Sequence, residues 1–122
     1  MAEDKRTALP QPFMERMQAM LLEEYEDFLA AYGKERRYGL RYNPLKTDRA
    51  AFLKRMPFAL EPVQWAEEGF YYLPEQQPGK HLFHEIGVYY IQEPSAMAVV
   101  EALAPQPGER ILDLCAAPGG KS

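Results

Sequence analysis

The sequence predicts an α/β fold in two parts: a small α+β domain over residues 1–92, then the beginning of a second domain with a parallel sheet over residues 93–122. Three observations support this prediction. Apolar residues recur at helical spacing over residues 14–32. Several short runs rich in Tyr, Phe and Ile follow, each bounded by Gly, Pro or Asn, as is typical of short strands. Finally, the apolar run 110–114 leads into a glycine-rich turn, which is typical of a buried parallel strand.

The first half of the chain carries the clearest helix and strand patterns. The apolar stripe at 14–32 predicts one helix, or two helices end to end, that end at Gly33 and bury a Met and aromatic face. The alternating run 37–43 predicts a strand. Residues 47–56 predict a short helix, because Thr and Asp cap helix N-termini and the residue before a proline disfavours helical geometry.

The second half alternates strand-like runs with turns. Residues 58–61, 69–73 and 87–91 are predicted strands, and residues 74–87 are a predicted loop. A proline suits the first position of a helix, so we expect a helix over 94–104. The side chains that this helix is expected to carry inward are Ala96, Met97, Val100 and Leu103.

Composition excludes several classes of protein. Apolar residues make up 47% and charged residues 26% of the chain, as in globular domains. No apolar run reaches the roughly 18 residues of a membrane span, and the N-terminus lacks the apolar part of a secretion signal. The single cysteine, Cys115, excludes a disulfide framework. His81 and His84 have only Glu85 nearby as a third ligand. We therefore expect a cytoplasmic protein without a membrane or metal partner.

Positive charge is concentrated in one segment. The whole chain has a net charge of −4, but residues 34–55 contain eight Lys and Arg against two acidic residues, a net charge of +6. A local basic stretch on an acidic chain is a candidate contact for nucleic-acid phosphates. A solvated face with ordinary helical ion pairs is the alternative, and composition alone does not choose between them.

The most informative segment is ILDLCAAPGGKS at 111–122. Small residues after a buried strand allow backbone N–H groups to approach a ligand closely. Gly120, Lys121 and Ser122 match the end of a phosphate-binding P-loop, but Cys115 stands where that loop needs its first glycine. The other candidate ligand is S-adenosylmethionine, with the turn around its amino-acid and ribose part. A plain strand-to-helix turn without a ligand is the third alternative.

Several segments, in order, resemble the Nol/Nop/Sun family of RNA 5-methylcytosine methyltransferases. Residues 113–122 (DLCAAPGGKS) resemble the cofactor motif of that family. Residues 39–46 (GLRYNPLK) resemble its R-x-N-x-L-K element, and residues 87–95 (GVYYIQEPS) its G-x-x-Y-x-Q-x-x-S element. The helical region 10–32, followed by residues 58–70, is most similar to bacterial ribosomal-RNA members of the RsmF type.

The resemblance implies an RNA-binding N-terminal domain followed by the start of a Rossmann-like methyltransferase domain. The implied activity is transfer of a methyl group from S-adenosylmethionine to C5 of a cytosine, in ribosomal RNA. The residues implied to line the cofactor pocket are Cys115, Ala116, Ala117, Pro118, Gly119, Gly120 and Lys121. Within the basic segment, the residues that we predict to contact RNA are Arg41, Asn43 and Lys46.

No catalytic residue is expected in this chain. Family members attack C6 of the base with one cysteine, use a second cysteine for release and an aspartate to stabilise the base, and all three follow the cofactor loop in sequence. The resemblance places Cys115 in the cofactor turn, so we do not expect it to be the nucleophile. Trp65 and the tyrosine pairs at 71–72 and 89–90 could stack on bases, but we expect them to fill the core.

The sequence also predicts a fragment. Only eight residues follow Leu114, whereas a parallel neighbour strand needs a crossover of about a dozen or more. We therefore expect the chain to be the N-terminal part of a longer enzyme. The alternative from another class is a non-catalytic RNA-binding module that is inactive on its own. A P-loop nucleotide binder is a third, disfavoured by Cys115.

Overall fold

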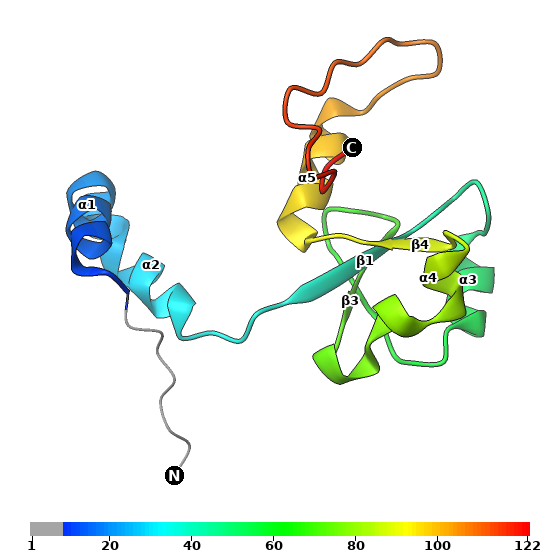
Figure 1. The fold of residues 1–122 in the computed structure, drawn as a ribbon, viewed down its shortest axis with the longest axis horizontal. Coiled ribbons are helices and arrows are strands. Elements are labelled where there is room, and N and C mark those ends of the chain that lie inside the picture. Colours follow the sequence, from blue (N-terminus) through cyan, green and yellow to red (C-terminus); the bar gives the residue numbers. More distant parts are fainter. Residues whose placement is uncertain (1–8) are drawn as a thin grey trace. The chain divides into compact units, whose positions relative to one another are not determined.

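A computed structural model describes residues 9–122, so the first eight residues of the predicted domain 1–92 lie outside the described part. The chain divides into two compact units, residues 1–36 and residues 37–122 (Figure 1). The first unit is helical in its described residues, whereas the second contains all the strands of the described chain. Among the described residues, no helix is both long enough and apolar enough to cross a membrane.

Two short helices form the described part of the first unit. Helix α1 (Gln11–Leu21) is followed by the 3-10 turn η1 (Leu22–Glu24) and helix α2 (Tyr25–Tyr32). The predicted alternative of two helices end to end, with Gly33 as the final cap, is confirmed. The predicted burial is only partly right, because Tyr25 is buried while Tyr32 is 53% exposed.

The second unit is built on a four-stranded antiparallel sheet with strand order β2-β3-β1-β4. The strands are β1 (Tyr38–Tyr42), β2 (Glu61–Pro62), β3 (Gly69–Tyr72) and β4 (Tyr89–Ile91). The strands predicted at 37–43, 69–73 and 87–91 are confirmed. The run 58–61 overlaps only the two-residue β2, and Phe58 and Leu60 instead pack against the core. The predicted α+β class of this domain is confirmed.

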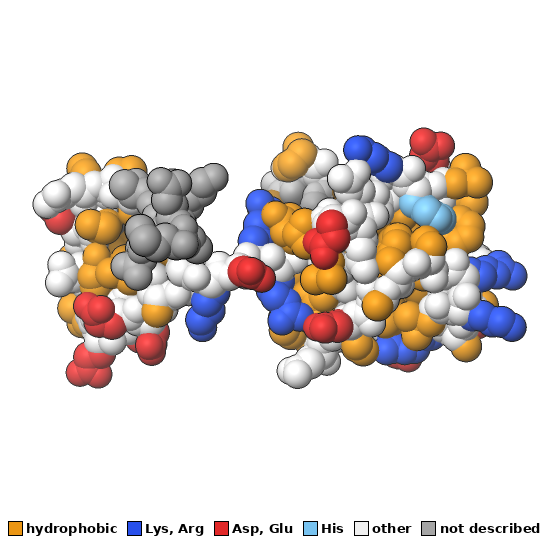
Figure 2. Space-filling model, turned by 90° about the horizontal axis from the view of Figure 1, so that it is seen from below, with side chains coloured by type: hydrophobic (Ala, Val, Ile, Leu, Met, Phe, Trp, Pro, Cys, Tyr) orange, Lys and Arg blue, Asp and Glu red, His pale blue; other side chains and the backbone are white. Residues whose placement is uncertain are grey.

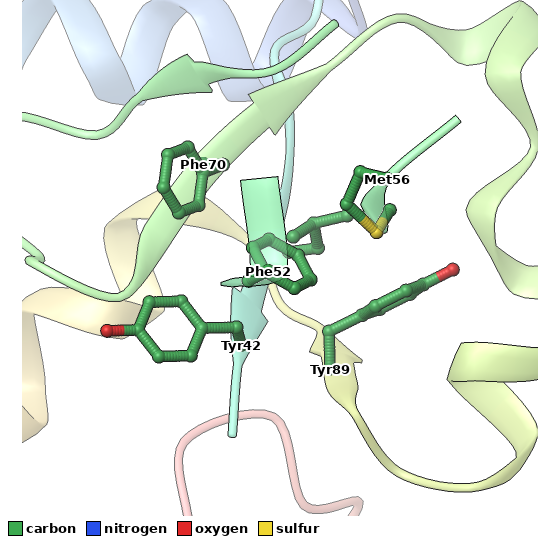
Figure 3. Packing of buried hydrophobic residues seen from close by; sticks show 6 residues of the cluster. Tyr42, Phe52, Met56, Phe70 and Tyr89 are labelled. Atoms are coloured by element: carbon green, nitrogen blue, oxygen red, sulfur yellow. The ribbon is translucent and has the colours of Figure 1, made fainter. Parts of the chain in front are cut away.

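One face of the sheet carries an aromatic core. Helix α3 (Arg49–Arg55) begins at Asp48, whose carboxylate accepts a hydrogen bond from the Ala51 N–H at 2.9 Å. Figure 3 shows the ring of its Phe52 among Tyr42, Phe70 and Tyr89. The ring centroids lie 5.3, 5.8 and 6.1 Å from that of Phe52, which is within the range of favourable aromatic pairs.

Helix α5 (Pro94–Leu103) packs on the other face, where two glycines leave room for it (Figure 1). Met97 is fully buried between the sheet and this helix. A Cβ atom at Gly69 would lie 2.6 Å from the Met97 sulfur, and one at Gly39 would lie 2.7 Å from the Gln92 carbonyl oxygen. Both strands therefore need glycine at these positions for α5 to approach.

The predicted loop 74–87 is wrong in detail, because it contains three short helical turns. They are η2 (Pro74–Gln76), η3 (Pro78–Lys80) and α4 (Leu82–Glu85). Prolines begin the first two turns, and the Gln76 side chain accepts a hydrogen bond from the Leu73 N–H at 2.8 Å. Elements of three or four residues are too short to show a helical period in sequence.

Residues 104–122 form neither helix nor strand, so the strand predicted at 110–114 is wrong. Leu112 and Leu114 are 81% and 86% exposed, rather than buried. An apolar run becomes a strand only beside a neighbour that pairs with its backbone, and no described segment pairs with this one. The predicted helix at 94–104 is confirmed, but Leu103 is 55% exposed and does not point inward.

Candidate functional site

Three sequence motifs meet at one cavity of about 470 Å³ in the second unit. This volume lies within the range of small-molecule pockets, about 300–1,000 Å³. Its lining includes two residues from each of three motifs: the R-x-N element, the Y-x-Q element and the end of the glycine-rich turn. These residues are Arg41, Asn43, Tyr90, Gln92, Lys121 and Ser122. The motifs are far apart in sequence, so only the fold brings them together.

Arg41 is the centre of an ion-pair cluster beside this cavity. One guanidinium nitrogen lies 2.9 Å from a Glu68 carboxylate oxygen and 2.6 Å from one of Glu101. The Arg41 side chain is 21% exposed, so these pairs are partly shielded from water. Glu68 precedes β3 and Glu101 lies on α5, so Arg41 connects the sheet to that helix. Two carboxylates therefore balance the positive charge predicted to meet a phosphate.

Asn43 and Lys46 connect the end of β1 to the segment before β4. The Asn43 amide donates to the Gly87 carbonyl at 3.3 Å, and its side-chain oxygen accepts from the Leu45 N–H at 3.0 Å. The Lys46 ammonium donates to the carbonyl of Ile86. These side chains stabilise the turn that leads from β1 towards α3, which is a structural role that the motif alone did not reveal.

Two other arginines of the basic segment also have partners. Arg37 pairs with Glu61 at 3.1 Å and lies over the Tyr71 ring, with 3.9 Å between guanidinium carbon and ring centroid. Arg49 donates to the Glu67 carbonyl. Figure 2 shows Lys and Arg side chains at several separate places on the larger unit, with acidic side chains near some of them. The segment is therefore in good part a network of paired charges.

Lys54 and Arg55 differ from these cations. Both are exposed on the last turn of α3, and no other described residue forms a hydrogen bond or ion pair with either side chain. Both belong to the basic segment 34–55, but neither is among the three residues predicted to contact RNA. For Lys54 the available signal was its spacing from Phe52, because residues two apart in a helix point to different faces.

The predicted cofactor residues Cys115–Lys121 form an irregular turn. Gly119 has φ of +105°, a conformation that L side chains rarely adopt, and a Cβ on Gly120 would meet nothing within 4 Å. Lys121 lines the cavity, whereas Ala116, Ala117 and Pro118 do not. Cys115 is a free, exposed thiol whose backbone N–H donates to Asp113 at 2.8 Å. The turn is thus open to solvent, and one end of it reaches the cavity.

The two histidines have structural surroundings. His81 caps α4 by accepting a hydrogen bond from the Phe83 N–H at 3.2 Å. His84 stacks on Tyr89, with 5.9 Å between ring centroids, and its buried Nδ1 has no hydrogen-bond partner among the described residues. In the described part of the chain, no three His, Cys, Asp or Glu side chains lie close enough to bind a metal ion together.

The aromatic residues divide between core and surface. Tyr89 is buried, as expected, and its hydroxyl donates to the Pro78 carbonyl at 2.6 Å. Burial raises the pKa of Tyr89 above its usual value, with the neighbouring Tyr72 adding to the effect. Tyr90 and Trp65 are 49% and 45% exposed, so the expectation that they fill the core is wrong for these two side chains.

Comparison with known proteins assigns the chain to a family. The model of the N-terminal domain of 16S rRNA methyltransferase RsmF matches residues 9–94. The chain belongs to this family. The RsmF match includes all four strands and ends at the first residue of α5, so the R-x-N and Y-x-Q elements lie inside it and the glycine-rich turn lies beyond it.

Three relatives illustrate the similarity to RsmF proteins, and each is named ribosomal RNA small subunit methyltransferase F. The protein of Pectobacterium carotovorum subsp. carotovorum (strain PC1) is 36% identical over 100% of this chain and 28% of its own length. That of Klebsiella pneumoniae (strain 342) is 39% identical over 93% and 26%. That of Escherichia coli O157:H7 (strain EC4115 / EHEC) is 40% identical over 80% and 22%. The chain thus spans about a quarter of the length of these relatives.

Proposed function

We propose that this chain is the N-terminal part of an RNA methyltransferase that transfers a methyl group from S-adenosylmethionine to C5 of a cytosine in small-subunit ribosomal RNA. The observation that carries the proposal is the convergence of three family-like motifs on one cavity. The names of the RsmF relatives support the RNA class. A ribosomal RNA substrate also supports a cytoplasmic location.

The described part of the chain would contribute one turn of the cofactor site. S-adenosylmethionine supplies a methyl group on a sulfonium centre, together with an amino-acid part that carries a carboxylate. The proposed cofactor residues are Cys115 to Lys121. The glycines leave space for close approach, and Lys121, which lines the cavity, carries a positive charge suited to a carboxylate. Gly119 fits this role, because a side chain would be strained at its positive φ.

RNA binding is the second proposed contribution. Arg41 and Asn43 line the cavity and Lys46 stabilises the adjoining turn, so these residues remain our candidates for the RNA side of the site. Lys54 and Arg55 are added as phosphate contacts, because their charges are exposed and no described side chain neutralises them. Phosphate contacts of this kind supply affinity without sequence specificity.

A non-catalytic RNA-binding module is the alternative. The observation that favours it is the unpaired segment 110–114, because a methyltransferase site needs this run as a strand of a larger sheet. The two proposals differ in whether the complete gene product transfers a methyl group. Both expect the described domain to bind RNA.

The deciding experiment incubates the complete gene product with small-subunit ribosomal RNA and S-adenosylmethionine bearing a labelled methyl group. We expect label in the RNA and 5-methylcytosine in its nucleoside digest. Label in another nucleoside would overturn the C5 assignment, whereas RNA binding without label would favour the non-catalytic module. A parallel reaction with Gly119→Val, which strains the turn at its positive φ, is expected to lose label while RNA binding is retained.

A further inference from the structure

Two side chains, one on β4 and one directly after it, bind the backbone of the glycine-rich turn. The Tyr90 hydroxyl donates a hydrogen bond to the Gly119 carbonyl at 3.3 Å, and the Gln92 amide donates one to the Gly120 carbonyl at 2.9 Å. The two carbonyls are adjacent in sequence, and the two donors are two residues apart. Alternate residues of a strand lie on the same face, which is why both donors can reach one turn.

Gln92 is well suited to bind the turn. It is 6% exposed and is the one buried polar side chain among the described residues. A buried amide needs a hydrogen-bond partner, and the Gly120 carbonyl supplies one. Its backbone N–H donates to the Gly39 carbonyl at 3.0 Å, so the strand β1 fixes the position from which the side chain extends.

The sheet thus provides a rigid support for a segment without regular structure. Residues 104–122 contain no helix or strand, so their conformation depends on contacts such as these. Tyr90 also lies opposite Arg41 in the sheet register, and the ion pairs of Arg41 connect the same region to α5. Side chains fixed by packing position a functional loop more precisely than the loop does alone.

We propose that Tyr90 and Gln92 are positioning residues, which fix the conformation of the turn Cys115–Lys121 through the Gly119 and Gly120 carbonyls. The cofactor role of that turn rests on the proposed function, but the positioning role does not. The four-stranded sheet then determines the conformation of the turn Cys115–Lys121, in addition to its proposed contribution to RNA binding.

Nuclear magnetic resonance of the ¹⁵N-labelled chain tests the positioning role directly. The variants are Gln92→Leu, which removes the donor at similar volume, and Tyr90→Phe, which removes only an exposed hydroxyl. We expect lower backbone order at Gly119, Gly120 and Lys121 in both variants, with the amides of β1 unchanged. Tyr89→Phe is the matched control, since it removes the neighbouring hydroxyl, whose partner is Pro78. Unchanged order at the turn in both test variants would overturn the proposal.

Cofactor binding by the complete gene product separates this proposal from the proposed function. Loss of one hydrogen bond is expected to weaken S-adenosylmethionine affinity severalfold, up to about tenfold, in Gln92→Leu, with kcat at saturating cofactor little changed. A turn that loosens without any change in affinity would support the positioning contact and overturn the cofactor role of Cys115–Lys121. A turn that stays rigid would overturn the positioning role whatever the affinity.

Discussion

At the scale of single residues, small side chains and buried polar groups decide how the second unit is assembled. Gly39 and Gly69 make room for Met97. The buried side-chain amide of Gln92 donates its hydrogen bond to the turn. None of these residues takes part chemically in the proposed methyl transfer. Each nevertheless determines where a residue of the candidate site can lie, so substitutions there test the structure before they test the activity.

Gly39→Ala is expected to destabilise the chain. Its Cβ would lie 2.7 Å from the Gln92 carbonyl oxygen and 2.9 Å from the Pro94 ring, and backbone cannot move aside cheaply. Overpacking of this kind costs about 1–3 kcal/mol in the free energy of unfolding, measured by urea denaturation. The control is Gly120→Ala, whose Cβ meets nothing within 4 Å and which shares the same change in unfolded-chain entropy. Equal unfolding midpoints for the two variants would contradict the packing argument.

The buried tyrosines predict a loss of stability at high pH. Burial raises the pKa of Tyr42, with Glu68 and Glu67 adding to the effect, and burial likewise raises that of Tyr89. Below pH 10 both states keep these protons. Above pH 10 the unfolded chain releases them first, so the free energy of unfolding falls as pH rises.

Urea denaturation between pH 9 and about 11 measures this dependence. Tyr89→Phe should show a shallower fall than the unmodified chain, after an overall decrease of about 1 kcal/mol from the lost hydrogen bond to Pro78. Tyr90→Phe, which removes an exposed hydroxyl, is the control. Identical slopes for the unmodified chain and Tyr89→Phe would rule out Tyr89 as a source of the pH dependence.

At the scale of elements, α3 and α5 cover opposite faces of one small sheet and have different roles. Helix α3 turns Phe52 into the aromatic core and leaves Lys54 and Arg55 exposed. Helix α5 packs through Met97 and carries Glu101 to Arg41. A partly exposed ion pair adds about 1 kcal/mol, whereas burial of a methionine side chain contributes about 1.5–3 kcal/mol. Packing therefore does more than the ion pair to fix α5 on the sheet.

The exposed end of α3 predicts a salt-dependent contribution to RNA affinity. The chain should bind RNA weakly, and the double variant Lys54→Ala, Arg55→Ala should bind more weakly still. For single-stranded RNA, the slope of log affinity against log salt should become shallower by about 1.4, which is about 0.7 for each lost phosphate contact. Fluorescence anisotropy at several salt concentrations measures both quantities. Lys80→Ala, an exposed cation outside the basic segment, is the control. A double variant with unchanged affinity and slope would exclude α3 from the RNA interface.

At the scale of the whole molecule, the described chain contains a four-stranded sheet and, over residues 104–122, a segment without helix or strand. We predict no measurable binding of S-adenosylmethionine to the 122-residue chain by calorimetry. The turn Cys115–Lys121 follows a run, 110–114, that forms no strand, so the turn lacks the sheet that would hold its N–H groups towards a ligand. Micromolar affinity would contradict this prediction and show that the turn and cavity suffice without further elements.

Local patterns in the sequence determined most of the elements. Helical spacing, capping residues and strand-like alternation are properties of neighbouring residues, so the helices at α1–α2, α3 and α5 and the strands β1, β3 and β4 could be predicted. The motifs also indicated the family, which the comparison confirmed. The run at 110–114 was mispredicted because its pattern describes a strand, whereas strand formation depends on a distant partner.

Only the tertiary structure decided which of these residues meet. Arg41, Gln92 and Lys121 are separated by many residues, and no local pattern shows that they line one cavity. The same holds for charge: the basic segment is evident in sequence, but its pairing with Glu61, Glu68 and Glu101 depends on chain folding. The period of apolar residues determines whether a segment forms a helix or a strand. The free energy of contacts between distant segments determines how those elements pack and which side chains meet at a site.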